Sequence, residues 1–202
     1  MNCRTYLFCA AILLSALGSA WAKVDDAQIV KDFEARVSGY VEVHKQQAGT
    51  EKPTDSPAKL AQQKDQNAEK MRAARPEAKQ GDIFAPEIAG YFRRQIAATL
   101  AGSDGRKIRA TLRHAEPLPN IHLEVNARYP QNVPLQSTPP TLLLNLPRLP
   151  DKLQYRIVGR ALLLYDMGTD LIVDFIPDAI SSELARNKST TETRRHGVTE
   201  KN

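Results

Sequence analysis

Cysteine and tryptophan are nearly absent from this sequence, and the few that occur lie at its start. The only cysteines are Cys3 and Cys9, and the only tryptophan is Trp21. If the first 22 residues are removed, the remaining chain can form no disulfide, and its stability must come from packing. The same absence excludes thiol nucleophiles, thiol redox chemistry and cysteine-ligated metals.

Long apolar runs are also scarce, and the one that occurs has the layout of a secretory signal peptide. Arg4 precedes an apolar stretch over residues 6–17, and small residues and the tripeptide Ala20-Trp21-Ala22 follow it. This order of charged, apolar and small residues predicts cleavage after Ala22 and a periplasmic or secreted protein. Because no second long apolar run follows, the predicted mature chain has no transmembrane segment.

Charge of one sign is not in large excess. The formal net charge is +5, and removal of Arg4 lowers it to +4, a mild value that does not predict nucleic-acid binding. The segment from Lys70 to Arg113, however, contains ten basic residues and only four acidic ones. Gathered on one side, they would suit anionic lipid or an acidic envelope polymer, whereas the alternative is a solvated helix surface. The candidate basic surface consists of Arg72, Arg75, Lys79, Arg93, Arg94, Arg106, Lys107 and Arg109.

Apolar residues recur at helical spacing in the first half of the mature chain. The pattern predicts helices over 25–47, from Ser56 to about residue 75, over 85–101, and over a short segment after Asp104. The second of these carries only a thin apolar stripe, so we expect it to lie mostly in water.

Strands are predicted in the second half, because eight prolines between Glu116 and Pro150 exclude long helices there. The strongest signal is a strand over 153–165, a turn near Met167, and a strand over 170–176. We expect residues 162–164 to lie opposite 171–173, and a hairpin edge to be able to recruit a partner strand.

The order of these elements predicts an α+β fold, with N-terminal amphipathic helices followed by a small antiparallel β-sheet with a C-terminal hairpin. The predicted division is a signal peptide over 1–22, N-terminal helices and a linker over 23–84, an α+β core over 85–180, and a disordered polar tail over 181–202.

Four aspartates recur every four residues in the predicted hairpin, from Asp166 to Asp178. Weak candidates for catalysis are Asp174 or Asp166 as a base, with Arg156 or Arg160 holding an anionic group. The alternative is structural: turn residues together with an ion pair between an arginine and Asp174 across the hairpin. The sequence has no serine elbow, no glycine-rich phosphate loop and no histidine pair at ligand spacing, so we predict no metal and no cofactor.

Three segments, at 74–84, 155–160 and 171–176, resemble a group of uncharacterised exported bacterial proteins, and the resemblance spans about Met71 to Ile180. It implies no activity, ligand or catalytic residue, only that the unit from Ala74 to Ile180 is the functional core. The leading hypothesis is therefore a non-enzymatic envelope protein that recognises an envelope protein, an anionic polymer or a lipid surface. The alternative is a carboxylate-dependent hydrolase or lyase acting on an envelope substrate.

Overall fold

Helices come first and strands last in the described part of the chain. The computed structural model describes residues 25–48, 54–114, 121–129 and 138–181. The predicted signal peptide and all but the first residue of the predicted tail lie outside these residues. Five helices and three strands follow in this order: α1 Asp26–Ala48, α2 Pro57–Ala74, α3 Pro86–Ala101, α4 Gly105–His114, α5 Pro140–Leu143, β1 Leu153–Val158, β2 Ala161–Asp166 and β3 Leu171–Ile176. The predicted α+β fold is confirmed.

The helices begin and end close to where the sequence predicts. A proline occupies the first turn of α2 and of α3, where a missing N–H costs nothing. Ser56 stands at the N-cap of α2, although its side chain makes no capping hydrogen bond. After α3 the chain turns so tightly that a Cβ on Gly105 would lie 1.8 Å from the carbonyl oxygen of Leu100. Only glycine fits there, so this residue permits the close approach of α3 and α4.

The sheet is antiparallel with the order β1-β2-β3. The predicted single strand over 153–165 is wrong, because it divides at a two-residue turn in which Gly159 has a φ of +59°. The predicted register is also wrong: Leu162 lies opposite Ile176, and Leu164 lies opposite Asp174. Every residue of β2 is buried, so no alternation of polar and apolar residues was available to indicate the register.

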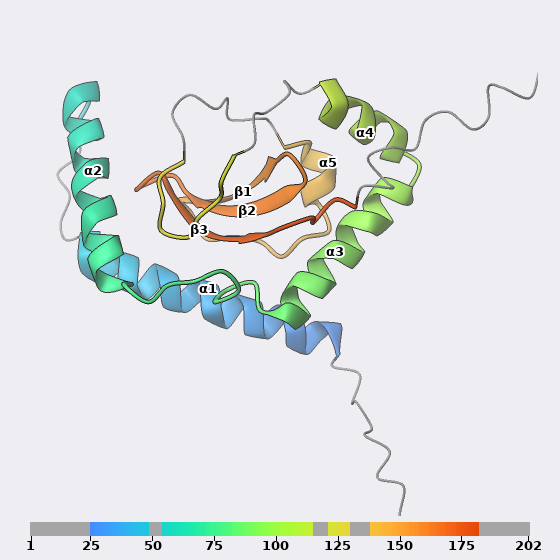
Figure 1. Cartoon of the computed structure of the whole chain (residues 1–202), viewed down its shortest axis with the longest axis horizontal. Coiled ribbons are helices and arrows are strands. Elements are labelled where there is room, and N and C mark those ends of the chain that lie inside the picture. Colours follow the sequence, from blue (N-terminus) through green and yellow to red (C-terminus); the bar gives the residue numbers. More distant parts are fainter. Residues whose placement is uncertain (1–24, 49–53, 115–120, 130–137, 182–202) are drawn as a thin grey trace, which may run out of the picture.

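One face of the sheet packs against α1 and α3 (Figure 1). Four aromatic rings meet there: the Phe33 ring lies 5.0 Å from Phe92, 5.7 Å from Phe84 and 6.5 Å from Tyr155. These side chains are all buried, and they form one hydrophobic core with residues of α2, α4 and α5. Both of the ranges 23–84 and 85–180 thus contribute to this core, and the division between them stays a prediction.

The opposite face of the sheet is covered in part by residues 121–129. The backbone of this segment follows β3: Asn126 N–H donates to the Ile172 carbonyl, Ile172 N–H to Ala127, and Tyr129 N–H to Asp170. The β3 edge of the hairpin is therefore already paired here and does not offer a free ladder to a partner strand. Among the described helices, none has the length and apolar character needed to span a membrane.

Candidate functional site

Asp174 is completely buried in the middle of β3. Its Oδ1 accepts hydrogen bonds from the N–H groups of Gly81 (3.0 Å) and Phe175 (2.7 Å), and its Oδ2 accepts from Ile83 (2.9 Å) and Phe84 (2.7 Å). Four backbone donors saturate the roughly four acceptor sites of a carboxylate. Asp174 therefore ties the loop between α2 and α3 to the last strand, and it offers no free lone pair for acid–base work.

A bulge directs Asp174 toward that loop. The pairing of β2 with β3 shifts between Leu164 and Tyr165, which leaves Val173 as an extra residue on β3. Val173 and Asp174 are therefore both buried. On the loop side, Gly81 has a φ of +91°, a conformation that favours glycine and helps the three loop N–H groups converge on one carboxylate.

The two candidate arginines do not approach Asp174. Arg160 forms an ion pair with Asp178 at the end of the hairpin, where both side chains are at least half exposed. Arg156 donates to the Gln154 side chain and lies over the Tyr165 ring, 5.8 Å from its centroid. The expected arginine–Asp174 ion pair is therefore wrong, because backbone N–H groups occupy the positions that an arginine would need.

Asp166, at the end of β2, is also completely buried, but its partners are different. Its Oδ2 accepts a 2.7 Å hydrogen bond from the Tyr40 hydroxyl, and its Oδ1 accepts one of 2.7 Å from Gly168 N–H. His44 Nε2 lies 3.3 Å from Oδ2, an ion-pair distance, yet the geometry is not that of a hydrogen bond. Asp166 thus joins two side chains of α1 to the β2–β3 turn.

Tyr40 is buried, and its surroundings disfavour ionisation. Burial raises the pKa of the Tyr40 hydroxyl well above its usual range, and the nearby Asp166 carboxylate raises it further. The Arg75 guanidinium lies 4.9 Å from the centre of the Tyr40 ring. Burial lowers the pKa of Arg75, while Tyr40, Asp82 and Asp174 act in the opposite direction. Tyr40 therefore serves as a neutral donor to Asp166.

A cavity of about 410 Å³ opens beside Asp166 and His44. Its buried lining consists of Tyr40, His44, Leu153 and Asp166, while Val41 is half-buried. The exposed lining residues are Lys45, Pro150, Asp151 and Lys152, which define its mouth. The cavity therefore has a largely apolar interior with one buried polar cluster and a charged mouth, a composition typical of small-molecule sites.

Gly168 keeps the turn close to this polar cluster. A Cβ at this position would lie 3.2 Å from Asp166 Oδ1 and 3.4 Å from His44 Nε2. The first distance is tighter than most contacts of real Cβ atoms and the second is at the limit of ordinary contact, so a larger residue would require the Asp166 carboxylate to shift by a few tenths of an ångström.

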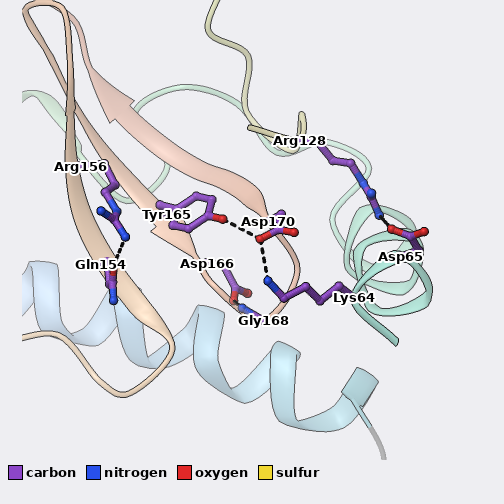
Figure 2. Close-up of polar contacts among 9 residues, drawn as sticks. All are labelled: Lys64, Asp65, Arg128, Gln154, Arg156, Tyr165, Asp166, Gly168 and Asp170. Carbon is purple, nitrogen blue, oxygen red and sulfur yellow. Dashed lines mark hydrogen bonds and ion pairs between the residues drawn. The ribbon is translucent and has the colours of Figure 1, made fainter. Parts of the chain in front are cut away.

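A second polar cluster holds the same turn to α2, as Figure 2 shows. Asp170 Oδ1 accepts hydrogen bonds from the Tyr165 hydroxyl (2.6 Å) and from Lys64 Nζ (3.0 Å). An ion pair of 2.6 Å joins Arg128 to Asp65 on the same helix. These contacts are half-exposed and their partners are ordinary, so they indicate a structural role for Asp170.

A wider groove of about 740 Å³ runs along β1. It lies between the strand and the segment that includes α5, and Arg148 and Arg156 contribute to its lining. Leu144, whose surface is 76% exposed, stands at this groove. On the outer edge of β1, Ile157 N–H donates to the Thr138 hydroxyl and Leu153 N–H to the Pro150 carbonyl. Part of the β1 edge is therefore already hydrogen-bonded within the chain and is not free to pair with a partner strand.

The candidate basic residues are distributed over separate elements. Arg72 and Arg75 belong to the end of α2 and the residue after it, whereas Arg106, Lys107 and Arg109 belong to α4, at the other end of the molecule in Figure 1. Arg72 pairs with Glu69, and Arg94 pairs with Asp26. Arg93 donates to the Pro177 carbonyl, and Arg109 donates to the Leu100 carbonyl. A basic surface remains a proposal, with α2 and α4 as two separate parts.

Comparison with protein-family models, with curated proteins and with solved structures found no match. Within the described residues, no group of three or more histidine, cysteine or acidic side chains is arranged to hold a metal ion. The site must therefore be interpreted from its own geometry.

Sequence analysis singled out Asp166 as a candidate but did not predict that Tyr40 and His44 would contact it. Tyr40 and His44 lie four residues apart on the apolar face of the predicted first helix, which was a signal that His44 is buried. No pattern connected that helix to a turn more than 120 residues later, as the separation of 126 between Tyr40 and Asp166 illustrates.

Proposed function

We propose that this chain is an exported protein of the bacterial envelope that acts by binding a partner rather than by catalysis. The observation that carries this proposal is the state of Asp174, the first catalytic candidate. All of its acceptor capacity is taken by four backbone N–H groups, and the two candidate arginines, Arg156 and Arg160, have other partners. A carboxylate used in this way stabilises a fold, and a general base needs a free lone pair.

The surfaces that remain for binding a partner are concave: a groove and a cavity. Strand addition at the β3 edge is disfavoured, because residues 126–129 already pair with that edge. The groove along β1, with its exposed Leu144, and the cavity beside Asp166 remain as candidates. The resemblance to exported proteins belongs to this proposal too, since two of its segments, 74–84 and 171–176, meet at Asp174.

The experiment that tests the proposal is site-specific photocrosslinking in cells. A photoreactive residue replaces Leu144 at the groove or Lys45 at the cavity mouth, and Lys59 on the exposed part of α2 serves as the matched control position. Capture of one protein from Leu144 or Lys45, at both low and high salt, is the expected result. Capture at low salt only would indicate a polyanion or a lipid surface. Capture at neither salt from either position would contradict a binding function.

One observation favours the second candidate, a carboxylate-dependent hydrolase or lyase. Asp166 lies beside His44 in a cavity, and this pairing of a carboxylate with an imidazole is common in acid–base catalysis. The variant His44→Gln tests this candidate, because it removes the imidazole, whose Nε2 makes no hydrogen bond in the described structure, and keeps a polar side chain. Thermal denaturation checks that the variant folds. An enzyme would lose its cellular function in this variant. Full complementation of a deletion strain would exclude His44 from any catalytic role.

A further inference from the structure

The groove along β1 has lining residues of two kinds, which belong to opposite faces of the sheet. Successive side chains of a strand point to opposite faces, and Tyr155 points to the face that packs against α1 and α3. The lining residues that share its core are Leu143, Leu146, Leu149 and Leu153. Arg156 points to the other face, where it lies opposite Leu163 and over the Tyr165 ring (Figure 2). The groove therefore has an apolar lining from one face and a basic lining from the other.

The basic lining is not neutralised by a described carboxylate. Arg148 and Arg156 both line the groove, whereas none of its described lining residues is acidic. Four other arginines each pair with an acidic side chain, but no ion pair among the described residues includes either of these two. The groove therefore favours a ligand that carries negative charge.

The two sides of the groove are held together within the chain. The Tyr155 hydroxyl donates a 3.0 Å hydrogen bond to the carbonyl of Pro147, the residue before Arg148. Leu153 N–H donates a 3.2 Å hydrogen bond to the Pro150 carbonyl. The segment that carries Arg148 is thus tied to β1 at two points, and a groove already in place reduces the entropy lost when a ligand binds.

Leu144 adds an exposed apolar surface to this groove. Only two large apolar side chains of the described chain are exposed, Leu144 at 76% and Leu60 at 49%. Leu60 lies on α2 and lines neither the groove nor the cavity beside Asp166, whereas Leu144 continues the apolar lining of the groove. A contiguous apolar surface with a charged border is typical of a site that contacts a protein.

The backbone of Tyr155 is also directed toward the groove. In an antiparallel ladder, alternate residues direct their N–H and C=O groups away from the partner strand. The N–H groups of Leu153 and Ile157 do so, because they bond to the Pro150 carbonyl and the Thr138 hydroxyl. Tyr155 lies midway between them and has the same orientation, but no described residue accepts a hydrogen bond from its N–H. One residue of an extended chain can pair with both of its backbone groups.

We propose that this groove binds an extended segment of a protein partner in which acidic and apolar side chains alternate. The apolar side chains contact Leu144 and the neighbouring leucines, the acidic ones contact Arg148 and Arg156, and the backbone pairs with Tyr155. Alternation fits because successive side chains of an extended segment point to opposite sides, as the two linings of the groove do. This inference deepens the proposed binding function and rests on it, since it names the site and the kind of segment that the site accepts.

The test is titration of the purified, ¹⁵N-labelled protein with synthetic peptides, followed through the amide resonances. The probe is a six-residue peptide that alternates leucine and glutamate. One control peptide has the same composition arranged as a leucine block and a glutamate block, and the other alternates leucine and lysine. The probe is expected to shift the Tyr155 amide saturably and to bind about tenfold more tightly than either control.

The apolar lining is tested by Leu144→Asp, which places an acidic group in the groove. This variant is expected to bind the probe about tenfold more weakly. The matched control is Leu60→Asp, which changes the other exposed leucine and should leave the affinity unchanged. Both leucines are exposed, so both variants are expected to keep the fold, which thermal denaturation checks.

The basic lining is tested by Arg148→Gln, whose exposed side chain has no ion-pair partner among the described residues. A loss of about threefold in affinity for the probe is expected, because an exposed ion pair is worth less than about 1 kcal/mol. Arg106→Gln removes the same charge from an exposed position on α4 and should not change the affinity.

Several results would overturn the proposal. Equal affinity for the probe and either control peptide would exclude recognition of alternating acidic and apolar side chains, and an unshifted Tyr155 amide would exclude the backbone pairing. Equal weakening in Leu144→Asp and Leu60→Asp, or in Arg148→Gln and Arg106→Gln, would exclude the groove as the site. Octanoate has an alkyl chain and a carboxylate but no peptide backbone, so binding of octanoate as tight as that of the probe would indicate a lipid-like ligand instead.

Failure of this inference is distinguishable from failure of the proposed function. If the probe does not bind but Leu144 captures a partner in cells, only the kind of segment is wrong. If the probe binds as expected and both crosslinking positions capture nothing in cells, the groove accepts peptides but the proposed cellular function is wrong.

Discussion

Two buried aspartates of one hairpin, Asp174 and Asp166, have opposite kinds of surroundings. Asp174 contacts four backbone N–H groups, three of them from the loop over 81–84. Its side chain is not exposed to solvent, and it lines neither the groove along β1 nor the cavity beside Asp166. Asp166 contacts one backbone N–H and the side chains of Tyr40 and His44, and it lines a cavity. The two aspartates are equally buried but differ in role. Backbone N–H groups fill every acceptor position of Asp174, whereas Asp166 lies at the wall of a cavity.

The largest expected effect is that of Asp174→Asn. The amide nitrogen would face backbone donors, and at least one N–H would be left without an acceptor, at about 1–3 kcal/mol for each group. We expect the free energy of unfolding to fall by about 3–5 kcal/mol, measured by urea denaturation. The control is Asp178→Asn, whose exposed ion pair with Arg160 is worth less than about 1 kcal/mol. Equal stability of the two variants would contradict the structural role of Asp174.

A smaller loss is expected for Asp166→Asn, about 2 kcal/mol, because one of its two hydrogen-bonded oxygens becomes an amide nitrogen. The fold of the 81–84 loop should not change. Hydrogen exchange provides the measurement: the Ile83 and Phe84 amides should keep their protection relative to the rest of the core in Asp166→Asn and lose it in Asp174→Asn. Loss of that protection in both variants would mean that the two sites are one cooperative unit.

Much of this comparison could not be predicted from the sequence. The helices could be, because Ile29, Phe33 and Val37 recur at helical spacing and Pro57 and Pro86 mark the starts. The aspartates could also be singled out, since one charge within the apolar strand over 171–176 needs a buried partner. The partners could not be identified. They are backbone groups of a distant loop, and the bulge at Val173 that brings them together leaves no mark in an apolar strand.

An intermediate effect is expected at alkaline pH. Burial raises the pKa of Tyr40, and burial together with Tyr91 and Glu34 raises the pKa of Tyr155. Because each folded-state pKa lies above the unfolded value of about 10, the neutral form stabilises the fold below pH 10. That stability should be lost above pH 10, at up to about 1.4 kcal/mol per pH unit for each tyrosine. Tyr40→Phe should reduce this slope in denaturation measured from pH 9 to pH 11, and an unchanged slope would contradict the prediction.

The smallest effects come from two glycines with opposite expected signs. Gly168→Ala should destabilise by about 1 kcal/mol, because the new Cβ would crowd the Asp166 carboxylate. Gly39→Ala should stabilise by about 0.5–1 kcal/mol, since Gly39 lies within α1 and a Cβ there meets nothing within 4 Å. Thermal denaturation of the two variants gives the comparison. A stabilised Gly168→Ala would show that the Asp166 cluster has room to move.

The contact of Asp174 with the 81–84 loop also bears on the order in which the chain acquires its structure. About 90 residues separate the two sides of this contact, so the earlier helices can form before it but cannot be held in their final arrangement until β3 has been synthesised. We expect the Ile83 and Phe84 amides to become protected in the same kinetic phase as β3, which pulse-labelled hydrogen exchange would reveal. Protection of these amides before β3 would contradict this order. A protein that completes its core with its last strand stays incompletely packed until its synthesis is nearly finished.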